Sequence, residues 1–192
     1  MAVEKQPEIF HNGDKSTFMT LKESDGMVRF ITGGEPNLIR SLVSVDGQEH
    51  KDLRAVVFPS VTPKAIRGLE DDIRTIAKSF VAEMLAKVPE CDFATDVAFL
   101  YPLRVIMTVL GVPQEDEPFM LKLTQELFGP QDPDTARIRE QLTAEQFSGM
   151  MQSVVADFGA YFRGITEDRR RNPRDDLATV IANAKIGGDY MP

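Results

Sequence analysis

The sequence predicts a mainly α-helical protein with one long loop and a short hairpin near its end. Asp46 and Thr143 each open a capping pattern, with Glu or Gln three residues later, that starts helices. Residues 63–88 repeat apolar side chains at steps of three and four, as an amphipathic helix does. Residues 96–111 are apolar nearly all round, which is typical of a helix at the centre of a bundle.

The composition is that of an ordinary globular chain. Its 192 residues, 42% hydrophobic and 27% charged, suffice for one domain with a sizeable core. The formal net charge of −8 argues against nucleic acid or an anionic membrane as the main partner. No apolar run reaches the roughly 18 residues of a membrane span and no signal-peptide pattern opens the chain, so we expect a cytoplasmic location. The single cysteine excludes an internal disulfide framework and a cysteine-rich metal site.

The first part of the chain is expected to hold two helices and a long loop. A short helix over residues 1–12 leads into the loop, residues 13–44, which is rich in glycine and polar residues. A helix over residues 45–58 follows, and His50 and Arg54 share one face of it because they are four residues apart. Two donors that point the same way favour an anionic ligand. A solvated helix face is the alternative for this pair taken alone.

The middle of the chain is expected to be helical as well. An amphipathic helix of about 24 residues is expected next, with Thr62 as its N-cap and Pro63 in its first turn. Cys91 has acidic neighbours and no adjacent glycine, so we interpret it as a linker cysteine and not as a metal ligand. The apolar helix over residues 96–111 ends at Gly111, where a proline two residues later stops it.

Three further elements complete the prediction. A helix over residues 115–128 and a loop precede a long helix, residues 143–171, whose Met and Phe side chains at helical spacing are interpreted as core. The arginines at its end match the negative end of the helix dipole. A short helix that starts at Asp175 or Asp176 and runs through Ala184, and a tight hairpin over residues 185–190, follow.

Three segments of this sequence resemble bacterial cytochrome P450 monooxygenases. They are His50-x-x-x-Arg54 after Asp46-Gly47 and before Phe58-x-x-x-Thr62-Pro63; Pro102-Leu-x-Val-Ile-x-x-x-Leu-Gly-Val-Pro113; and Asn172-Pro-Arg-Asp-Asp-Leu-Ala-Thr. In order, they are similar to the family's heme-contacting helix, its fifth helix and the segment ahead of its long central helix. The resemblance implies a partial cytochrome P450 fold, as a single domain over residues 1–192 that is incomplete at both ends.

The resemblance also implies site residues. His50 and Arg54 match the pair that holds the heme propionates in the family. The loop before this helix and the helix over residues 115–128 match segments that line the substrate pocket, which makes Leu38, Val43 and Leu127 candidate substrate contacts. Similar candidates, for which ordinary packing is the alternative, are Leu42, Leu123 and Phe128.

The activity that the resemblance implies is that of a heme-thiolate monooxygenase. Such an enzyme inserts one oxygen atom from O2 into a small hydrophobic substrate, with electrons from a redox partner such as a ferredoxin. The sequence of residues 123–129 and 181–186 resembles that of members acting on terpenes or other compact hydrocarbons. The family's iron-ligating cysteine and oxygen-activating residues have no match here. We therefore expect a fragment that is inactive alone and holds neither a catalytic residue nor a metal ligand.

Two alternatives come from other classes of protein. A cofactor-free helical interaction domain would use its apolar surface to bind a partner. A four-helix carboxylate metal protein would need Glu-x-x-His pairs on facing helices. The only histidines are His11 and His50, and neither lies in such a pair, so the sequence argues against the metal protein.

Overall fold

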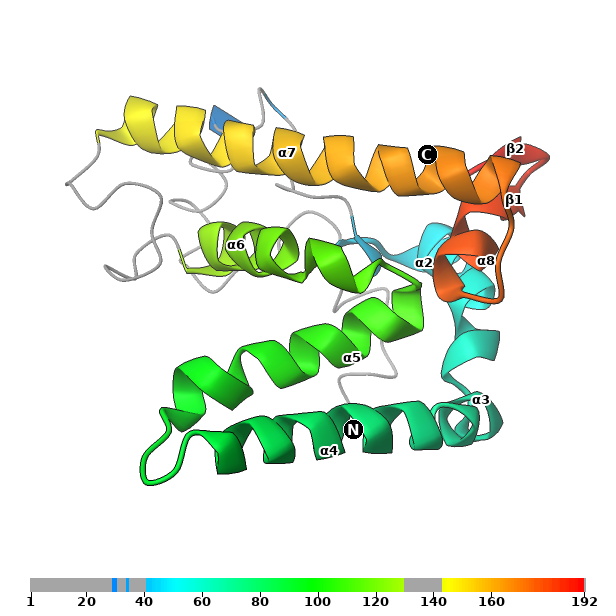
Figure 1. Cartoon of the computed structure of the whole chain (residues 1–192). Helices are drawn as coiled ribbons and strands as arrows, with labels where there is room; N and C mark the ends of the chain where they lie inside the picture. The colour runs from blue at the N-terminus through cyan, green and yellow to red at the C-terminus, as the bar shows by residue number, and fades with distance from the viewer. Residues whose placement is uncertain (1–28, 31–33, 35–40, 130–142, 192) are drawn as a thin grey trace, which may run out of the picture. The chain divides into compact units, whose positions relative to one another are not determined.

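A computed structural model of the chain describes residues 29–30, 34, 41–129 and 143–191. Contacts divide the chain into two compact units, the first formed by residues 1–56 and 138–160, the second by residues 57–137 and 161–192. Within the described ranges the regular structure is helical apart from one small hairpin, which confirms the mainly α class (Figure 1). The expected helix over residues 1–12 lies outside these ranges. The expectation of a single domain stays a prediction.

The first unit contains the 3-10 turn η2, Leu42–Ser44, and the helix α2, Gly47–Val57, whose last residue already belongs to the second unit. The helix begins directly after Asp46, where the capping pattern placed its start. The first part of the long helix α7, Ala144–Arg171, also lies in this unit. Its predicted capping box is confirmed, because Thr143 N–H donates to Gln146 Oε1 at 2.9 Å and Gln146 N–H donates to Thr143 Oγ1 at 3.2 Å.

The second unit opens with the 3-10 turn η3, Phe58–Val61, and two helices, α3, Pro63–Gly68, and α4, Glu70–Ala86. Thr62 caps α3 as predicted and accepts a bond from Ala65 N–H at 3.3 Å. The prediction of one continuous helix was wrong, because the chain breaks at Leu69. Gly68 is a weak helix former, and the acidic residues that open α4 suit a new helix N-terminus.

The following helices run back and forth through this unit (Figure 1). They are the short π-helix η4, Ala94–Ala98; α5, Leu100–Leu110; the 3-10 turn η5, Gln114–Asp116; and α6, Glu117–Phe128. Helix α5 packs against both α4 and α6. It was expected to be buried all round, yet Met107 is its only buried residue and Ile106 is 56% exposed. The elements that contact α5 among the described residues cover only part of its circumference.

The end of the second unit is formed by the last turns of α7, by α8, Leu177–Asn183, and by the hairpin of β1, Lys185–Ile186, and β2, Asp189–Tyr190. The strands are antiparallel, and the glycines between them have φ values of 66° and 101°, so the predicted hairpin is confirmed. No helix in the described part of the chain is long and apolar enough to cross a membrane.

Arg104 joins three helices of the second unit. From α5 its guanidinium donates to both carboxylate oxygens of Glu117 on α6, at 2.6 and 2.7 Å. It lies 3.7 Å from a carboxylate oxygen of Glu83 on α4 and 4.5 Å from the centre of the Phe80 ring. Bidentate pairing of this kind fixes direction as well as distance. The only charge on the apolar helix therefore sets the order in which α4, α5 and α6 pack.

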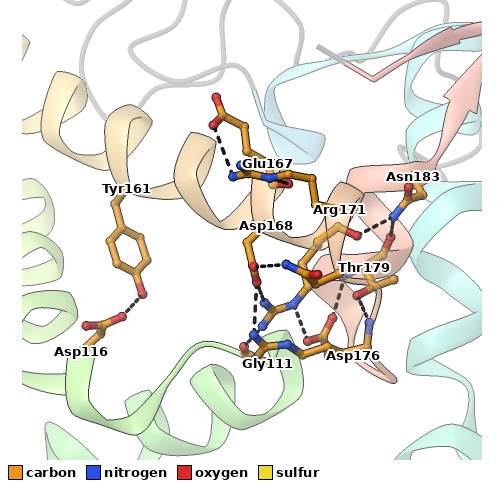
Figure 2. A network of polar contacts seen from close by, with 12 residues as sticks. Gly111, Asp116, Tyr161, Glu167, Asp168, Arg171, Asp176, Thr179 and Asn183 are labelled. Atoms are coloured by element: carbon orange, nitrogen blue, oxygen red, sulfur yellow. Dashed lines mark hydrogen bonds and ion pairs between the residues drawn. The ribbon is translucent and has the colours of Figure 1, made fainter.

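Arg169 joins three helices at the other end of the second unit. Its side chain is 1% exposed and donates to Asp176 Oδ2 at 2.7 Å, to Asp168, and to the carbonyl oxygen of Gly111. Asp176 in turn caps α8 by accepting from Thr179 N–H at 2.7 Å, as Figure 2 shows. One buried cation thus ties the last turns of α7 to the end of α5 and the start of α8.

Gly111 is the point where this network touches α5. Its φ of 77° is left-handed, as at many helix C-termini, and a Cβ placed there would lie 2.1 Å from Asp176 Oδ2. Glycine is therefore required by backbone conformation and by space together.

Replacement of Arg169 by methionine removes the cation that pairs with Asp176 at 2.7 Å and leaves that carboxylate enclosed. We expect the free energy of unfolding to fall by about 3–5 kcal/mol, the usual cost of breaking a buried pair. Arg171→Met is the matched control, because its pair with Glu167 is exposed at 3.9 Å and contributes about 1 kcal/mol at most. Denaturant unfolding measures both, and equal losses would contradict the role assigned to Arg169.

The Asp176 carboxyl gives the stability a pH dependence. Burial opposes its ionisation, but hydrogen bonds from Thr179 and Arg169 outweigh burial and lower its pKa below the ordinary value. The charged form therefore stabilises the fold fully above about pH 4, and this contribution is lost as pH falls through the lowered pKa. In denaturant titrations, the stability gap between the parent and Asp176→Asn should be constant from pH 7 to 5 and narrow below pH 4. The exposed Asp175→Asn serves as control, and a gap independent of pH would refute this origin.

A pair of glycine replacements tests the requirement for glycine at position 111. Gly111→Ala should lower the free energy of unfolding by about 2 kcal/mol or more, because it strains φ and pushes on Asp176. Gly164→Ala, within α7, meets no atom within 4 Å and should raise it by about 0.5–1 kcal/mol through helix propensity. Thermal unfolding of both variants distinguishes these opposite signs.

Candidate functional site

Helix α2 carries the pair of donors that the sequence singled out. His50 N–H donates to the Asp46 carbonyl at 3.3 Å, so the helix is continuous from its first turn through Arg54. Residues four apart on such a helix have Cβ atoms about 6 Å apart on the same face. The structure therefore confirms the common helix of His50 and Arg54. Their ligand is a separate question.

The side chains of α2 are accessible. No residue of the helix is buried; His50 is half-buried and Arg54 is exposed. A guanidinium offers a fork of N–H donors and an imidazole at least one N–H or N acceptor. Together they fit a carboxylate or phosphate that approaches from outside the helix.

The candidate substrate contacts fall in different places. Val43 lies in η2 and is 75% exposed, and Leu127 is half-buried on α6. Leu38 lies outside the described residues. Of the similar candidates on α6, Leu123 is 0% exposed and belongs to the core, whereas Phe128 is exposed at the end of the helix. A buried packing position is the simpler account of Leu123.

Cys91 is an exposed free cysteine between α4 and η4, with Glu90 and Asp92 on either side. Among the residues that the structure describes, no group of three or more His, Cys, Asp and Glu side chains is arranged to hold a metal ion.

The most strongly organised polar groups were missed by sequence reasoning. Arg104 was noted only as the single charge of an apolar helix, and Arg169 only as one of three charges at a helix end. Each is bound to carboxylates, and no buried side-chain donor or acceptor in the described part lacks a hydrogen bond. The signal for Arg104 was present, since a charge on an apolar face requires a partner. These clusters are saturated by protein groups, which makes them structural.

Tyr161 forms the third polar contact of this kind. Its hydroxyl donates to Asp116 Oδ2 at 2.7 Å (Figure 2). Its ring lies 5.6 Å from that of Phe119, centre to centre. Burial first, and the bond to Asp116 second, raise the pKa of the hydroxyl. A phenol held protonated in this way joins α7 to η5 and does no acid–base chemistry near neutral pH.

Comparisons with named proteins and with solved structures point to the same family. No protein-family model matches the chain. Cytochrome P450-terp from Pseudomonas sp is 41% identical over 192 residues, which are 100% of this chain and 45% of that protein. The methyl-branched lipid omega-hydroxylase of Mycobacterium tuberculosis is 32% identical over 153 residues, 79% of this chain and 34% of that protein.

A solved structure matches the chain about as closely as cytochrome P450-terp does. The crystal structure of CYP108D1 from Novosphingobium aromaticivorans has a TM-score of 0.84 and 42% identity, and the match covers 100% of this chain and 43% of that one. The chain thus spans less than half the length of these relatives. Its sequence and its fold therefore identify the chain as homologous to a part of the cytochrome P450 proteins.

Proposed function

We propose that this chain forms part of a heme-thiolate monooxygenase and that α2 is its heme-contacting helix. The observation that carries the proposal is the placement of His50 and Arg54 one turn apart on an accessible helix. The homology to cytochrome P450 proteins over the whole chain supports it.

The two side chains would bind the carboxylates of the heme propionates. Arg54 supplies a permanent positive charge and can donate two parallel bonds to one carboxylate. His50 would supply a second N–H donor one turn earlier, so that a ligand with two anionic arms could bind both side chains. Heme bound through a thiolate supplies the chemistry that inserts one atom of O2 into a C–H bond. In this proposal the iron ligand lies outside these 192 residues, and the chain alone is inactive.

The proposed substrate is a compact hydrophobic molecule. The related proteins are named a P450-terp, a methyl-branched lipid omega-hydroxylase and a steroid C26-monooxygenase, and the last two names describe apolar substrates. The sequence of residues 123–129 and 181–186 favours a terpene-like compound as substrate. A ferredoxin-like redox partner, O2 as co-substrate and a cytoplasmic location complete the proposal.

A cofactor-free interaction domain is the second candidate function. The observation in its favour is a set of exposed apolar side chains on α4 and the segment after it: Val81, Leu85, Val88 and Phe93. Such a set can bind another protein. It predicts no affinity for heme, so a heme titration of the complete gene product separates the two functions.

Arg54→Ala in the complete gene product should weaken heme retention about 10- to 100-fold, because one charged hydrogen bond contributes about 1.5–3 kcal/mol. Transfer of heme to apomyoglobin measures the loss, and Arg54→Lys should restore part of it. Lys51→Ala, an exposed change on the same helix, is the control and should leave transfer unchanged. Retention equal to the parent in both Arg54→Ala and His50→Ala would refute the assignment to the propionates.

A further inference from the structure

Helix α4, which packs against α5 in the second unit, has a packed side and an exposed side (Figure 1). The large apolar side chains of α4 that are buried or half-buried are Ile73, Ile76, Phe80 and Met84. A second line of side chains is exposed along the length of the helix, and it consists of Arg74, Lys78, Val81 and Leu85. Because these four are spaced at steps of four, three and four residues, they lie on one side of α4. We call them the α4 stripe.

The C-terminal half of the α4 stripe is apolar. Val81 and Leu85 are each more than half exposed, and so is Val88, whose N–H donates to the Leu85 carbonyl at 3.4 Å in the turn after the helix. These side chains belong to the set that favours the second candidate function. Several large apolar side chains together mark a contact surface better than single ones do. One helix face is small beside the roughly 800 Å² per partner of a stable interface, so we expect a weak contact.

Charges of opposite sign flank this apolar half. Lys78 precedes it by one turn, and Glu90 follows the helix in a turn closed by its own N–H and the Lys87 carbonyl at 3.2 Å. Neither Lys78 nor Glu90 forms an ion pair with another residue that the structure describes, whereas Lys87 is paired with Asp96 at 2.6 Å. The negative end of the helix dipole adds to the charge of Glu90. One end of this surface therefore attracts anions and the other attracts cations.

We propose that two copies of the complete gene product pair through the α4 stripe, with their α4 helices antiparallel. In such a two-fold arrangement every contact occurs twice. Val81 packs against the second copy's Leu85, and Lys78 reaches the second copy's Glu90. Lys78 lies five residues before position 83 and Glu90 seven after it, so the two differ by about 3 Å along the axis, which a lysine side chain spans. A parallel pair would place Lys78 against Lys78, so charge selects the antiparallel order.

The two charged residues give a test that only contact between copies can pass. Sedimentation of the complete gene product over a series of concentrations should show a reversible dimer. Lys78→Glu or Glu90→Lys alone sets like charges together at both symmetric contacts and should weaken dimerisation about tenfold. A mixture of the two variants, one of them fluorescently labelled, has opposite charges at both contacts and should form heterodimers with the affinity of the parent. Within one copy the two residues are about 18 Å apart along the helix direction, so this rescue cannot arise inside a single molecule.

Two further variants complete the test. Lys122→Glu, an equal change of charge at an exposed position of α6, is the matched control and should leave dimerisation unchanged. Leu85→Gln keeps a good helix former but removes an apolar contact, and it should abolish the dimer.

A parent that stays monomeric at every concentration, as it would if another part of the gene product covered the α4 stripe, overturns the proposal. So does a dimer that neither charge variant weakens, or a mixture of the two variants that forms no heterodimer. Heme content is read from the Soret band of the same samples. Because dimerisation and heme content are measured separately, failure of the dimer is distinguished from failure of the proposed heme binding.

Discussion

The burial of the Arg169 guanidinium is the constraint on which the second unit depends. A cation removed from water is tolerated only where carboxylates and carbonyls surround it in good geometry. Here the acceptors come from Gly111 at the end of α5, Asp168 on α7 and Asp176 at the start of α8. The requirement reaches the backbone, because Asp176 occupies the space that a side chain at position 111 would need. The end of α5 is thereby held against the end of α7 and the start of α8.

Arg104 applies the same rule at the other side of α5. Its contacts with Glu117 on α6 and Glu83 on α4 are directional, whereas the apolar contacts of α5 with both helices are not. Apolar packing supplies attraction between these helices, and the arginine selects which partner lies on which side. That division explains why a single charge occurs in an otherwise apolar helix.

Most helices and turns were predicted by patterns among neighbouring residues. Contacts between residues far apart in the sequence could not be predicted from it. The capping box at Thr143, the left-handed Gly111 and the terminal hairpin depend on neighbours within a few residues, and the structure confirms them. The break at Leu69 was missed because the apolar spacing continues across it. Burial around α5 was overestimated because periodicity shows which face is apolar and says nothing of how much is covered. The bond of Arg104 to Glu117, 13 residues away, and that of Arg169 to Gly111, 58 residues away, follow only from packing.

The contrast between these arginines and Arg54 bears on where ligands can bind. Arg104 and Arg169 have their donors occupied by carboxylate and carbonyl groups of the chain, so a ligand would have to break existing bonds. Arg54 is exposed on a helix without buried residues, beside His50 on the same face. In the proposed function this accessible face would bind the anionic arms of the ligand, whereas Arg104 and Arg169 hold the fold.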